Sequence, residues 1–398
     1  MRTTSGTGRS AMHGGTPAFP DGLPLARPTV PNPAAVAEEL RKVLESEVLT
    51  NGPKVEELEH QVAEYTGVRH AVAVSSCTAG LMLVLRVSDL SGDVVVPSFT
   101  FAATAHAVAW NDLRPAFTDI NSETLTLSVD CTARAIGVRT AAIMATHTYG
   151  TPADVDRLTD VARRAGIKLF FDAAHALGSR HQDRSVGGFG DAEVFSLTPT
   201  KPVVAGEGGI ITTNDDAMAE GCRLGRDYAK EPDYDCRFVG LNARMSELHA
   251  TVGLASFQGI EERIAERNQI AELYMDALAA VPGISFPLIR EGDRSTYKDF
   301  TILVDADAFG MAASRLADAL GLEGVETRRY YSPPVHRMKP YRGFPATNGG
   351  LSHTEAAADR VLTLPLWVGM TEEHVARLAD AVTRIRARPV GRPRRPRA

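Results

Sequence analysis

Short apolar segments alternate with helical segments through the first 255 residues, and this alternation constrains the fold more than any other feature. Helices separate the expected strands, which span residues 70–74, 94–97, 114–117, 141–145 and 168–172. Parallel strands joined by helices require right-handed crossovers, so the pattern predicts a mostly parallel, doubly wound α/β sheet. We expect a large domain over residues 26–255 and a smaller C-terminal α/β domain over residues 256–387. One long helix, from residue 245 to about 280, would lead from the first into the second.

The two ends of the chain differ in composition from the body between them. Residues 1–25 are rich in Gly, Ser, Thr and Pro, so we expect a disordered extension there. Seven arginines and no acidic residue occur within residues 384–398, and we expect a disordered basic tail over residues 388–398. Removing these seven charges from the net charge of -6 leaves -13 for the rest of the chain, which argues against nucleic acid as a partner.

The four cysteines show no paired spacing, so the sequence indicates neither a metal site nor a disulfide framework. Unpaired cysteines fit a reducing compartment, and we expect the protein in the cytoplasm. We find no apolar run of membrane-spanning length and no signal peptide, and we therefore expect no membrane partner.

A lysine followed by a glycine-rich turn lies between two apolar segments within residues 195–211. Just past a strand end, the amine of Lys201 would face a cleft and be partly desolvated, which favours the neutral amine. A neutral amine can attack a carbonyl or hold an aldehyde cofactor as a Schiff base. Ser196 could donate to a phosphate, and the glycines permit close approach of the backbone. Taken alone, the stretch is explained equally well by a surface lysine in a strand-to-turn connection.

An acidic residue ends the apolar segment 168–172, which is typical of a buried parallel strand. Open α/β sheets bind ligands at this edge, beyond the carboxyl ends of their strands. The carboxylate of Asp172 would there pair with the protonated pyridine nitrogen of pyridoxal phosphate and hold the ring as an electron sink. Capping of the following turn is the competing interpretation. Asp172 and Lys201 at successive strand ends, with Ser196 between them, favour the cofactor.

A turn of small residues opens the helix that follows the first expected strand. Ser76, Cys77 and Thr78 would lie at the N-terminus of this helix, where free backbone N–H groups and the helix dipole form a phosphate cradle. Many strand-to-helix connections have such a turn, so the turn alone is a weak indicator. It indicates a phosphate site only in combination with Asp172 and Lys201.

Three motifs together resemble those of the pyridoxal-phosphate aminotransferases of the DegT/DnrJ/EryC1/StrS family, namely Asp172-Ala-Ala-His175, Ser196-Leu-Thr-Pro-Thr-Lys201 and Gly206-Glu-Gly-Gly209. The resemblance runs from about residue 28 to about residue 382. It implies fold type I, with a seven-stranded sheet in the large domain, and an enzyme that aminates keto sugars or cyclitols.

The resemblance also implies roles for individual residues. Phe101 would stack on the pyridine ring, and Asn242 would reach the phosphate of the neighbouring subunit's cofactor, so that a homodimer shares its active sites. A helix N-cap is the competing role for Asn242. The implied cofactor site comprises Ser76, Cys77, Thr78, Phe101, Asp172, His175, Ser196, Lys201 and Asn242, with cysteine at position 77 where the family usually has glycine. The implied sugar pocket comprises His147, Tyr149, Arg328, Tyr331 and His336.

The implied reaction is amino transfer from an amino acid, usually glutamate, to a keto sugar, with pyridoxamine phosphate as the intermediate form of the cofactor. The substrate would be a nucleotide-linked keto-deoxysugar of secondary-metabolite or surface-polysaccharide biosynthesis. Amination of a cyclitol is one alternative, and a sugar dehydratase of the same family is another, although such a relative has histidine in place of Lys201. A decarboxylase or desulfurase on the same fold is disfavoured by the motifs. A cofactor-binding sensor with a DNA-binding module lacks a basic helix-turn-helix segment.

Overall fold

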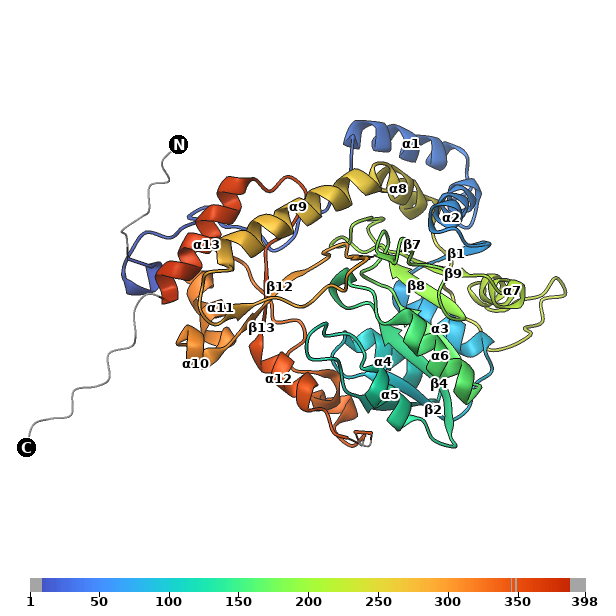
Figure 1. Cartoon of the computed structure of the whole chain (residues 1–398). Coiled ribbons are helices and arrows are strands. Elements are labelled where there is room, and N and C mark those ends of the chain that lie inside the picture. The colour runs from blue at the N-terminus through green and yellow to red at the C-terminus, as the bar shows by residue number, and fades with distance from the viewer. Residues whose placement is uncertain (1–8, 345, 348, 387–398) are drawn as a thin grey trace, which may run out of the picture.

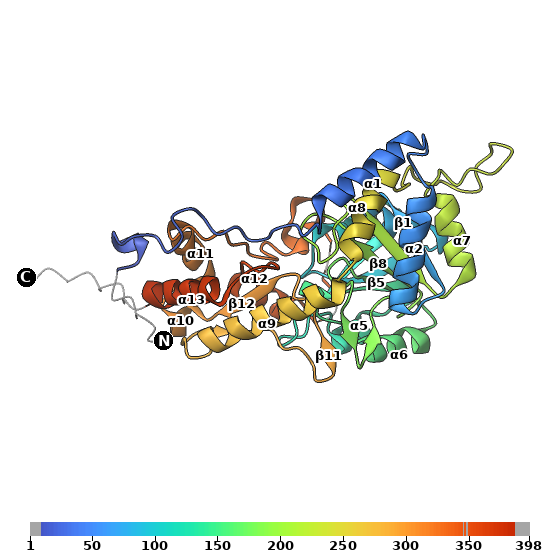
Figure 2. The same ribbon diagram turned by 90° about the horizontal axis from the view of Figure 1, so that it is seen from above.

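A computed structural model of the chain describes residues 9–344, 346–347 and 349–386. Figure 1 shows a larger body built on a central sheet and a smaller body beside it. Helix α9 (Ile260–Leu278) runs from one body to the other, as the view from above in Figure 2 also shows.

The central sheet has seven strands in the order β1-β9-β8-β5-β4-β2-β3. Strand β9 runs antiparallel to both of its neighbours, and the pairs from β8 to β3 are all parallel. The mostly parallel, doubly wound sheet predicted from the sequence is therefore confirmed. The strands are β1 (His70–Val74), β2 (Asp93–Pro97), β3 (Arg114–Thr118), β4 (Thr140–Thr146), β5 (Lys168–Asp172), β8 (Ala192–Ser196) and β9 (Gly209–Thr213).

Helices cover both faces of this sheet because its strands bury apolar side chains on both sides. Val94 and Val96 of β2 face a cluster under α3, α4 and α7, whereas Val95 faces a cluster under α5 and α6. Helices α2 and α8 pack over β1, β8 and β9. The helices of this body are α1 (Pro33–Glu45), α2 (Pro53–Thr66), α3 (Cys77–Val87), α4 (Ala102–Ala109), α5 (Val129–Ala135), η2 (Thr148–Gly150), α6 (Val155–Ala165), α7 (Asp216–Gly225) and α8 (Glu247–Phe257).

The smaller body is built on an antiparallel sheet in the order β10-β12-β13. Helices α9, α11 and α13 bury their apolar faces against it in one cluster. Its elements are β10 (Ile284–Ser285), β12 (Phe300–Val304), α10 (Ala306–Phe309), α11 (Ala313–Leu322), η3 (Val335–Arg337), η4 (Lys339–Tyr341), α12 (Ser352–Arg360), β13 (Val361–Leu364) and α13 (Glu372–Arg386).

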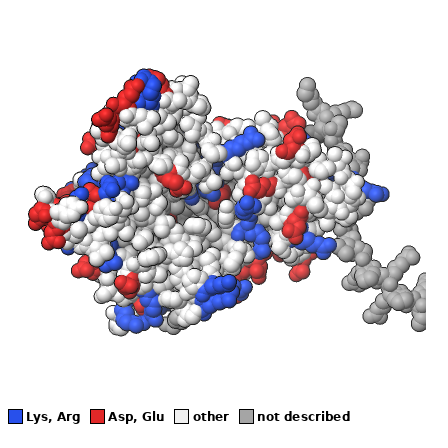
Figure 3. Space-filling model, turned by 180° about the vertical axis from the view of Figure 1, so that it is seen from behind, with Lys and Arg blue, Asp and Glu red and all other residues white. Residues whose placement is uncertain are grey.

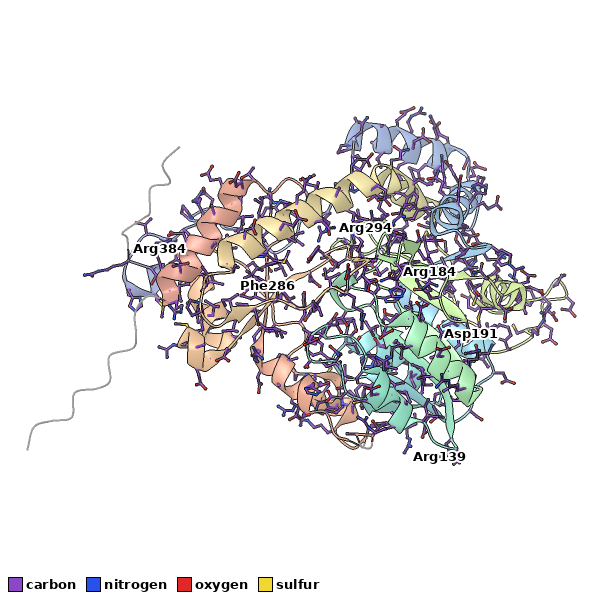
Figure 4. All side chains as sticks on the ribbon, in the orientation of Figure 1. Arg139, Arg184, Asp191, Phe286, Arg294 and Arg384 are labelled. Atoms are coloured by element: carbon purple, nitrogen blue, oxygen red, sulfur yellow. The ribbon has the colours of Figure 1, made fainter. Side chains whose placement is uncertain are left out.

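A third, small sheet ties the two bodies together. Strand β11 (Asp293–Arg294) pairs with β6 (Arg180–His181), which pairs in turn with β7 (Arg184–Ser185). Arg294, labelled in Figure 4, also donates to Glu261 of α9 at 2.6 Å. This contact lowers the pKa of Glu261 to about 2.

The prediction of a disordered extension over residues 1–25 is wrong for residues 9–25. This segment includes η1 (Ala11–His13), and its Phe19 and Leu23 are buried in the core of the smaller body. Glu323 accepts hydrogen bonds from two of its backbone N–H groups, at 2.7 and 2.8 Å. The local composition gave no sign of this partner, which lies about 300 residues further along the chain. Residues 1–8 and the predicted tail, 388–398, lie outside the described residues.

The single long helix expected from residue 245 to 280 is also corrected, because it is two helices. α8 ends at Phe257 and α9 begins at Ile260, with Gly259 between them at a φ of +69°. A left-handed residue cannot continue a right-handed helix, so the chain turns there. The turn falls close to residue 255, where we expect the large domain to end; that boundary remains a prediction.

The surface carries charges of both signs. On the face shown in Figure 3, Lys and Arg side chains lie in small groups among Asp and Glu side chains. None of the described helices combines the length and the apolar character needed to cross a membrane.

Candidate active site

A cavity of about 330 Å³ opens at the carboxyl edge of the central sheet, beside the ends of β5 and β8 and the first turn of α3. Segments of both bodies line it. The predicted site residues that line it are Ser76, Cys77, Thr78, Phe101, Asp172, His175, Ser196, Lys201 and Tyr331. Among the described residues, no cluster of three His, Cys, Asp or Glu side chains is arranged to hold a metal ion.

Asp172 is the last residue of β5, and its carboxylate is buried and held at both oxygens. Oδ2 accepts a hydrogen bond from the hydroxyl of Thr104 at 2.6 Å, and Oδ1 accepts one from the backbone N–H of Ala174 at 3.2 Å. Burial raises the pKa of Asp172, while these two hydrogen bonds and the charge of Lys201 oppose the rise. The carboxylate is therefore fixed in orientation at the cavity wall.

A short row of hydroxyl groups supports this carboxylate. Thr104 of α4 lies 2.9 Å from the hydroxyl of Thr100, which lies 3.1 Å from that of Thr146 at the end of β4. Sequence analysis missed Thr104, because it precedes Asp172 by 68 residues and nothing in its own segment points to a carboxylate. Its role becomes visible only when the sheet brings α4 beside β5.

Lys201 lies in the connection between β8 and β9, where the chain turns back on itself. The backbone N–H of Leu197 donates to the carbonyl of Gly208, and its carbonyl accepts a hydrogen bond from the N–H of Ala205, which closes the loop that carries the lysine. Gly206 and Gly208 adopt φ values of +82° and +157°, which favour glycine. The side chain points into the cavity. Burial, followed by the charge of Lys298, lowers the pKa of Lys201 to about 7, so a large fraction of the amine is neutral at physiological pH.

The N-terminus of α3 forms another wall of the cavity. Ser76 caps the helix by accepting a hydrogen bond from the N–H of Ala79 at 3.1 Å. Cys77 is the first helical residue and has no positive φ, so the side chain in place of the family's glycine causes no backbone strain. Strand β9 passes so close that a Cβ on Gly209 would lie 2.5 Å from the backbone nitrogen of Cys77.

Aromatic side chains flank the opening. Phe101 precedes α4 and lines the cavity with its side chain 62% exposed, whereas Phe99, two residues earlier, is fully buried in the core. Tyr331 lines the cavity from the smaller body and packs edge-on against Phe99, with ring centroids 5.6 Å apart.

His175 lines the cavity three residues after Asp172 and is almost fully buried. Burial lowers its pKa well below the ordinary value, and the charges of Lys201 and Lys298 lower it further, so the ring is neutral. Among the described residues, its Nδ1 has no hydrogen-bond partner, and neither has Oδ2 of Asp299, 4.0 Å away.

His147 was predicted to line the sugar pocket, but the structure places it inside the protein. Its ring is fully buried and stacks on Phe171 at 4.9 Å. Nδ1 accepts a hydrogen bond from the N–H of Ala153, so Nε2 carries the proton and donates it to Glu193 at 3.0 Å. Both ring nitrogens thus have protein partners, which leaves the ring no contact with the cavity.

Three further residues of the predicted sugar pocket do not line this cavity. Tyr149 is buried behind it, stacked on Tyr331 and donating to the backbone carbonyl of Tyr330. Arg328 pairs with Glu326 on the surface at 2.8 Å. His336 is held by the hydroxyl of Ser98 at 2.6 Å and by Glu355 at 3.2 Å. Of the predicted segment, Tyr330 and Tyr331 line the cavity, whereas tertiary contacts turn Arg328 and His336 away from it.

Asn242 also lies outside the cavity of its own chain. Its backbone forms a bridge with Asp227, just beyond α7, and its side chain is exposed. The competing role as a helix N-cap is wrong, because Ser246 caps α8 by accepting a hydrogen bond from the N–H of His249.

The residues around the cavity fit pyridoxal phosphate. Lys201 offers an amine that loses its proton near neutral pH, and Asp172 offers an oriented carboxylate at the same edge of the sheet. The first turn of α3 offers backbone N–H groups to a phosphate, with Thr78 and Ser196 nearby. An aldehyde, a ring nitrogen and a phosphate each find a matching group in one cavity.

Comparison with known proteins assigns the chain to a family. The model of the DegT/DnrJ/EryC1/StrS aminotransferase family matches residues 33–383. The chain belongs to this family. A curated member, the dTDP-4-amino-4,6-dideoxy-D-glucose transaminase of Escherichia coli, is 30% identical over 361 residues, which cover 89% of this chain and 96% of the relative.

Solved structures agree. DesI, determined in the presence of its TDP-sugar product, is 38% identical with a TM-score of 0.90, over 95% of this chain and 96% of DesI. DesV of S. venezuelae, in complex with a ketimine intermediate, is 30% identical with a TM-score of 0.84, over 89% and 95% of the two chains. The prediction of a fold type I, pyridoxal-phosphate-dependent aminotransferase is confirmed, and the sequence resemblance on which it rested is real.

Proposed function

We propose that this aminotransferase moves an amino group from an amino acid, in the first instance glutamate, to a keto sugar carried on a nucleotide. The observation that carries the proposal is the single cavity in which Lys201, with a pKa of about 7, meets the anchored carboxylate of Asp172 and the N-terminus of α3. The sugar substrate is supported by DesI, whose structure was determined with a TDP-sugar product.

Lys201 has two tasks in this proposal. With pyridoxal phosphate bound, its Nζ would hold the aldehyde carbon of the cofactor until the donor amine took its place. The free Nζ would next take the proton from the donor's α-carbon. A general base is most effective when its pKa lies near the working pH, and the pKa of Lys201 is about 7. When bound, pyridoxal phosphate supplies the electron sink that makes this carbon acidic.

Asp172 and the α3 N-terminus orient the chemistry without taking part in proton transfer at the substrate. The carboxylate of Asp172, which Thr104 keeps from rotating away, would accept the N–H of a pyridinium ring. The first turn of α3 would bind the phosphate with its N–H groups. Phe101, which lines the cavity, would cover the ring and exclude water from it.

We further propose that two chains share each active site in a homodimer. Asn242 lies outside the cavity of its own chain, which leaves its side chain available to another subunit. Three large apolar residues of the larger body are also exposed, namely Phe101 (62%), Trp110 (73%) and Val239 (77%). A second copy of the chain would cover such apolar groups.

We also place the enzyme in the cytoplasm. Its four cysteines are free, with Cys77 and Cys222 buried, Cys131 partly buried and Cys236 exposed. An exposed thiol stays reduced in a reducing compartment, which supports this location.

The function is tested with the purified holoenzyme, glutamate and a panel of nucleotide-linked keto sugars and keto cyclitols. We expect a nucleotide sugar to gain an amine in place of its keto oxygen, seen in the mass and proton spectrum of the product, and Lys201→Ala to give none. A product that has lost water without gaining nitrogen would identify a dehydratase. Amination of a cyclitol alone would contradict the proposed substrate class.

A further inference from the structure

A second lysine, Lys298, lines the same cavity as Lys201. Lys298 belongs to the segment between β11 and β12, at the base of the smaller body, and only 8% of it is exposed. Apart from Lys201, it is the one Lys or Arg among the described residues that line this cavity.

The backbone that carries Lys298 is clamped by a buried arginine. The guanidinium of Arg267, on α9, donates to the carbonyl oxygens of Thr296 at 3.0 Å, of Tyr297 at 2.6 Å and of Lys298 at 2.9 Å. Such a fork of charge-assisted hydrogen bonds fixes the path of the chain. The direction in which Lys298 enters the cavity is therefore built into the fold.

The ammonium group of Lys298 has N–H donors that no protein acceptor among the described residues uses. Its Nζ lies 2.7 Å from Oδ1 of Asp299 and 5.4 Å from the ring centroid of Tyr330. An ammonium group has three N–H donors, and Asp299 is its one hydrogen-bond acceptor among the described residues. Two donors remain for a group that enters the cavity.

The amino-acid donor brings a carboxylate on the carbon next to its reacting amine, and this charge needs a partner when it leaves water. Lys201 cannot serve, because the donor amine displaces it. Arg328, the arginine of the predicted sugar pocket, does not line the cavity and lies on the surface beside Glu326. Lys298 is close enough to Lys201 that its charge is the largest influence after burial on the pKa of that amine. A group that replaces the amine of Lys201 is thus within reach of Lys298.

We propose that Lys298 binds the α-carboxylate of the amino-acid donor and so selects the substrate of the first half of the reaction. The inference rests on the proposed function. It assigns Lys298 no task in the second half, because the keto sugar has no carboxylate. If Lys298 bound the diphosphate of a nucleotide sugar instead, its loss would impair the second half.

The test follows the two half-reactions separately with Lys298→Met, which keeps the length of the side chain and removes its charge. Glutamate is added to the pyridoxal-phosphate form, and the keto sugar is added to apoenzyme loaded with pyridoxamine phosphate. We expect the KM for glutamate to rise about 10- to 100-fold, the effect of one lost charge-assisted hydrogen bond, with the KM for the keto sugar within twofold of the parent. Because the charge of Lys298 also lowers the pKa of Lys201, kcat changes in both halves and does not discriminate between the two binding roles. Lys298→Arg should recover part of the loss, and Lys339→Met, at an exposed lysine, should change neither half.

Binding without turnover gives an independent measurement. 2-Methylglutamate keeps the amine and both carboxylates but has no α-proton to lose, so its affinity is read from the cofactor absorbance alone. We expect the same loss of affinity in Lys298→Met. An unchanged affinity and an unchanged KM for glutamate would overturn the inference, and so would an equal rise in the KM values for glutamate and for the keto sugar. A parent enzyme that reacts with glutamate but aminates no nucleotide sugar would contradict the proposed function and leave the role of Lys298 standing.

Discussion

At the scale of single residues, the amine of Lys201 connects the structure most closely to a measurable property. The pKa of Lys201 lies at about 7, below the ordinary 10.5, because burial and the charge of Lys298 both disfavour the ammonium form. The amine is therefore protonated and unreactive below pH 7, and it becomes a nucleophile as the pH rises through this value.

This titration predicts how apoenzyme reacts with pyridoxal, which carries no phosphate of its own to titrate. The rate of attachment to Lys201, trapped with borohydride and read by mass spectrometry, should rise with a midpoint near pH 7 and level off about one unit above it. Nα-acetyl-lysine amide is the reference amine, and its rate of attachment should keep rising up to about pH 10. A Lys201 rate that keeps rising toward pH 10 would show that burial does not control this amine.

Asp172→Asn should keep the fold and lose most of the turnover. A neutral amide cannot balance the charge of a pyridinium ring, and the lost charge-assisted hydrogen bond is worth roughly 1.5–3 kcal/mol. Thr104→Val, which removes the donor to Oδ2, should cause a smaller loss in the same direction. Steady-state kinetics beside far-UV circular dichroism separates this effect from unfolding. An Asp172→Asn variant within twofold of the parent rate would assign the carboxylate another role.

The sequence predicted those cavity residues that belong to motifs at strand ends. It missed the residues that reach the cavity from other segments of the chain. Asp172 and Lys201 are recognisable from their own segments. Thr104 and Lys298 are not, because only the folded sheet and the clamp of Arg267 bring them to the cavity. His147 failed as a pocket residue because its direction is set by a buried partner, Glu193.

At the scale of elements, the close packing of β9 against the start of α3 determines the shape of the proposed phosphate site. A Cβ on Gly209 would lie 2.5 Å from the nitrogen of Cys77 and 2.7 Å from the carbonyl carbon of Ser76. Backbone atoms cannot yield cheaply to such a contact, so strand or helix must shift.

Gly209→Ala is therefore expected to weaken cofactor binding more than it weakens the fold. The shifted helix would point its N–H groups away from the phosphate, and the dissociation constant of pyridoxal phosphate should rise by about tenfold or more. Gly137→Ala is the matched control, because a Cβ at Gly137 meets nothing within 4 Å. Equal cofactor affinity in the two variants would contradict this account of the α3 wall.

The periodicity of apolar residues predicted the type of most helices and strands. It failed where a single residue or a distant contact determines the local structure. The apolar pattern continues through the break between α8 and α9, but Gly259 at a φ of +69° ends the path of the first helix. The segment 9–25 has a composition typical of disorder, yet Phe19 and Leu23 are buried in the core of the smaller body. The sequence of the segment itself does not indicate that this core lies next to it.

At the scale of the whole molecule, Lys201 of the larger body and Lys298 of the smaller body meet across one cavity, and Asn242 lies outside it. The sequence predicted both bodies, but which side chains face one another depends on how β11 and α9 join them. The proposed homodimer adds a third contribution, from a second copy.

Mixing two inactive variants tests this sharing. Lys201→Ala removes the amine, and Asn242→Asp sets a negative charge against the partner's phosphate. After random exchange of equal amounts, about half of the dimers are mixed and hold one intact site, so about a quarter of the parental activity should return. Activity that stays absent, with subunit exchange shown independently, would place Asn242 in its own subunit's site or outside any site.

The identity of the lysine that binds the cofactor tests the central claim most directly. Holoenzyme is reduced with borohydride, digested and mapped by mass spectrometry, with every lysine of the chain in competition. The structure predicts a yellow protein whose phosphopyridoxyl label lies on Lys201 alone, since this amine combines a pKa of about 7 with a place beside Asp172. A label on Lys298, which also lines the cavity, or on Lys168 or Lys230, which do not, would contradict it.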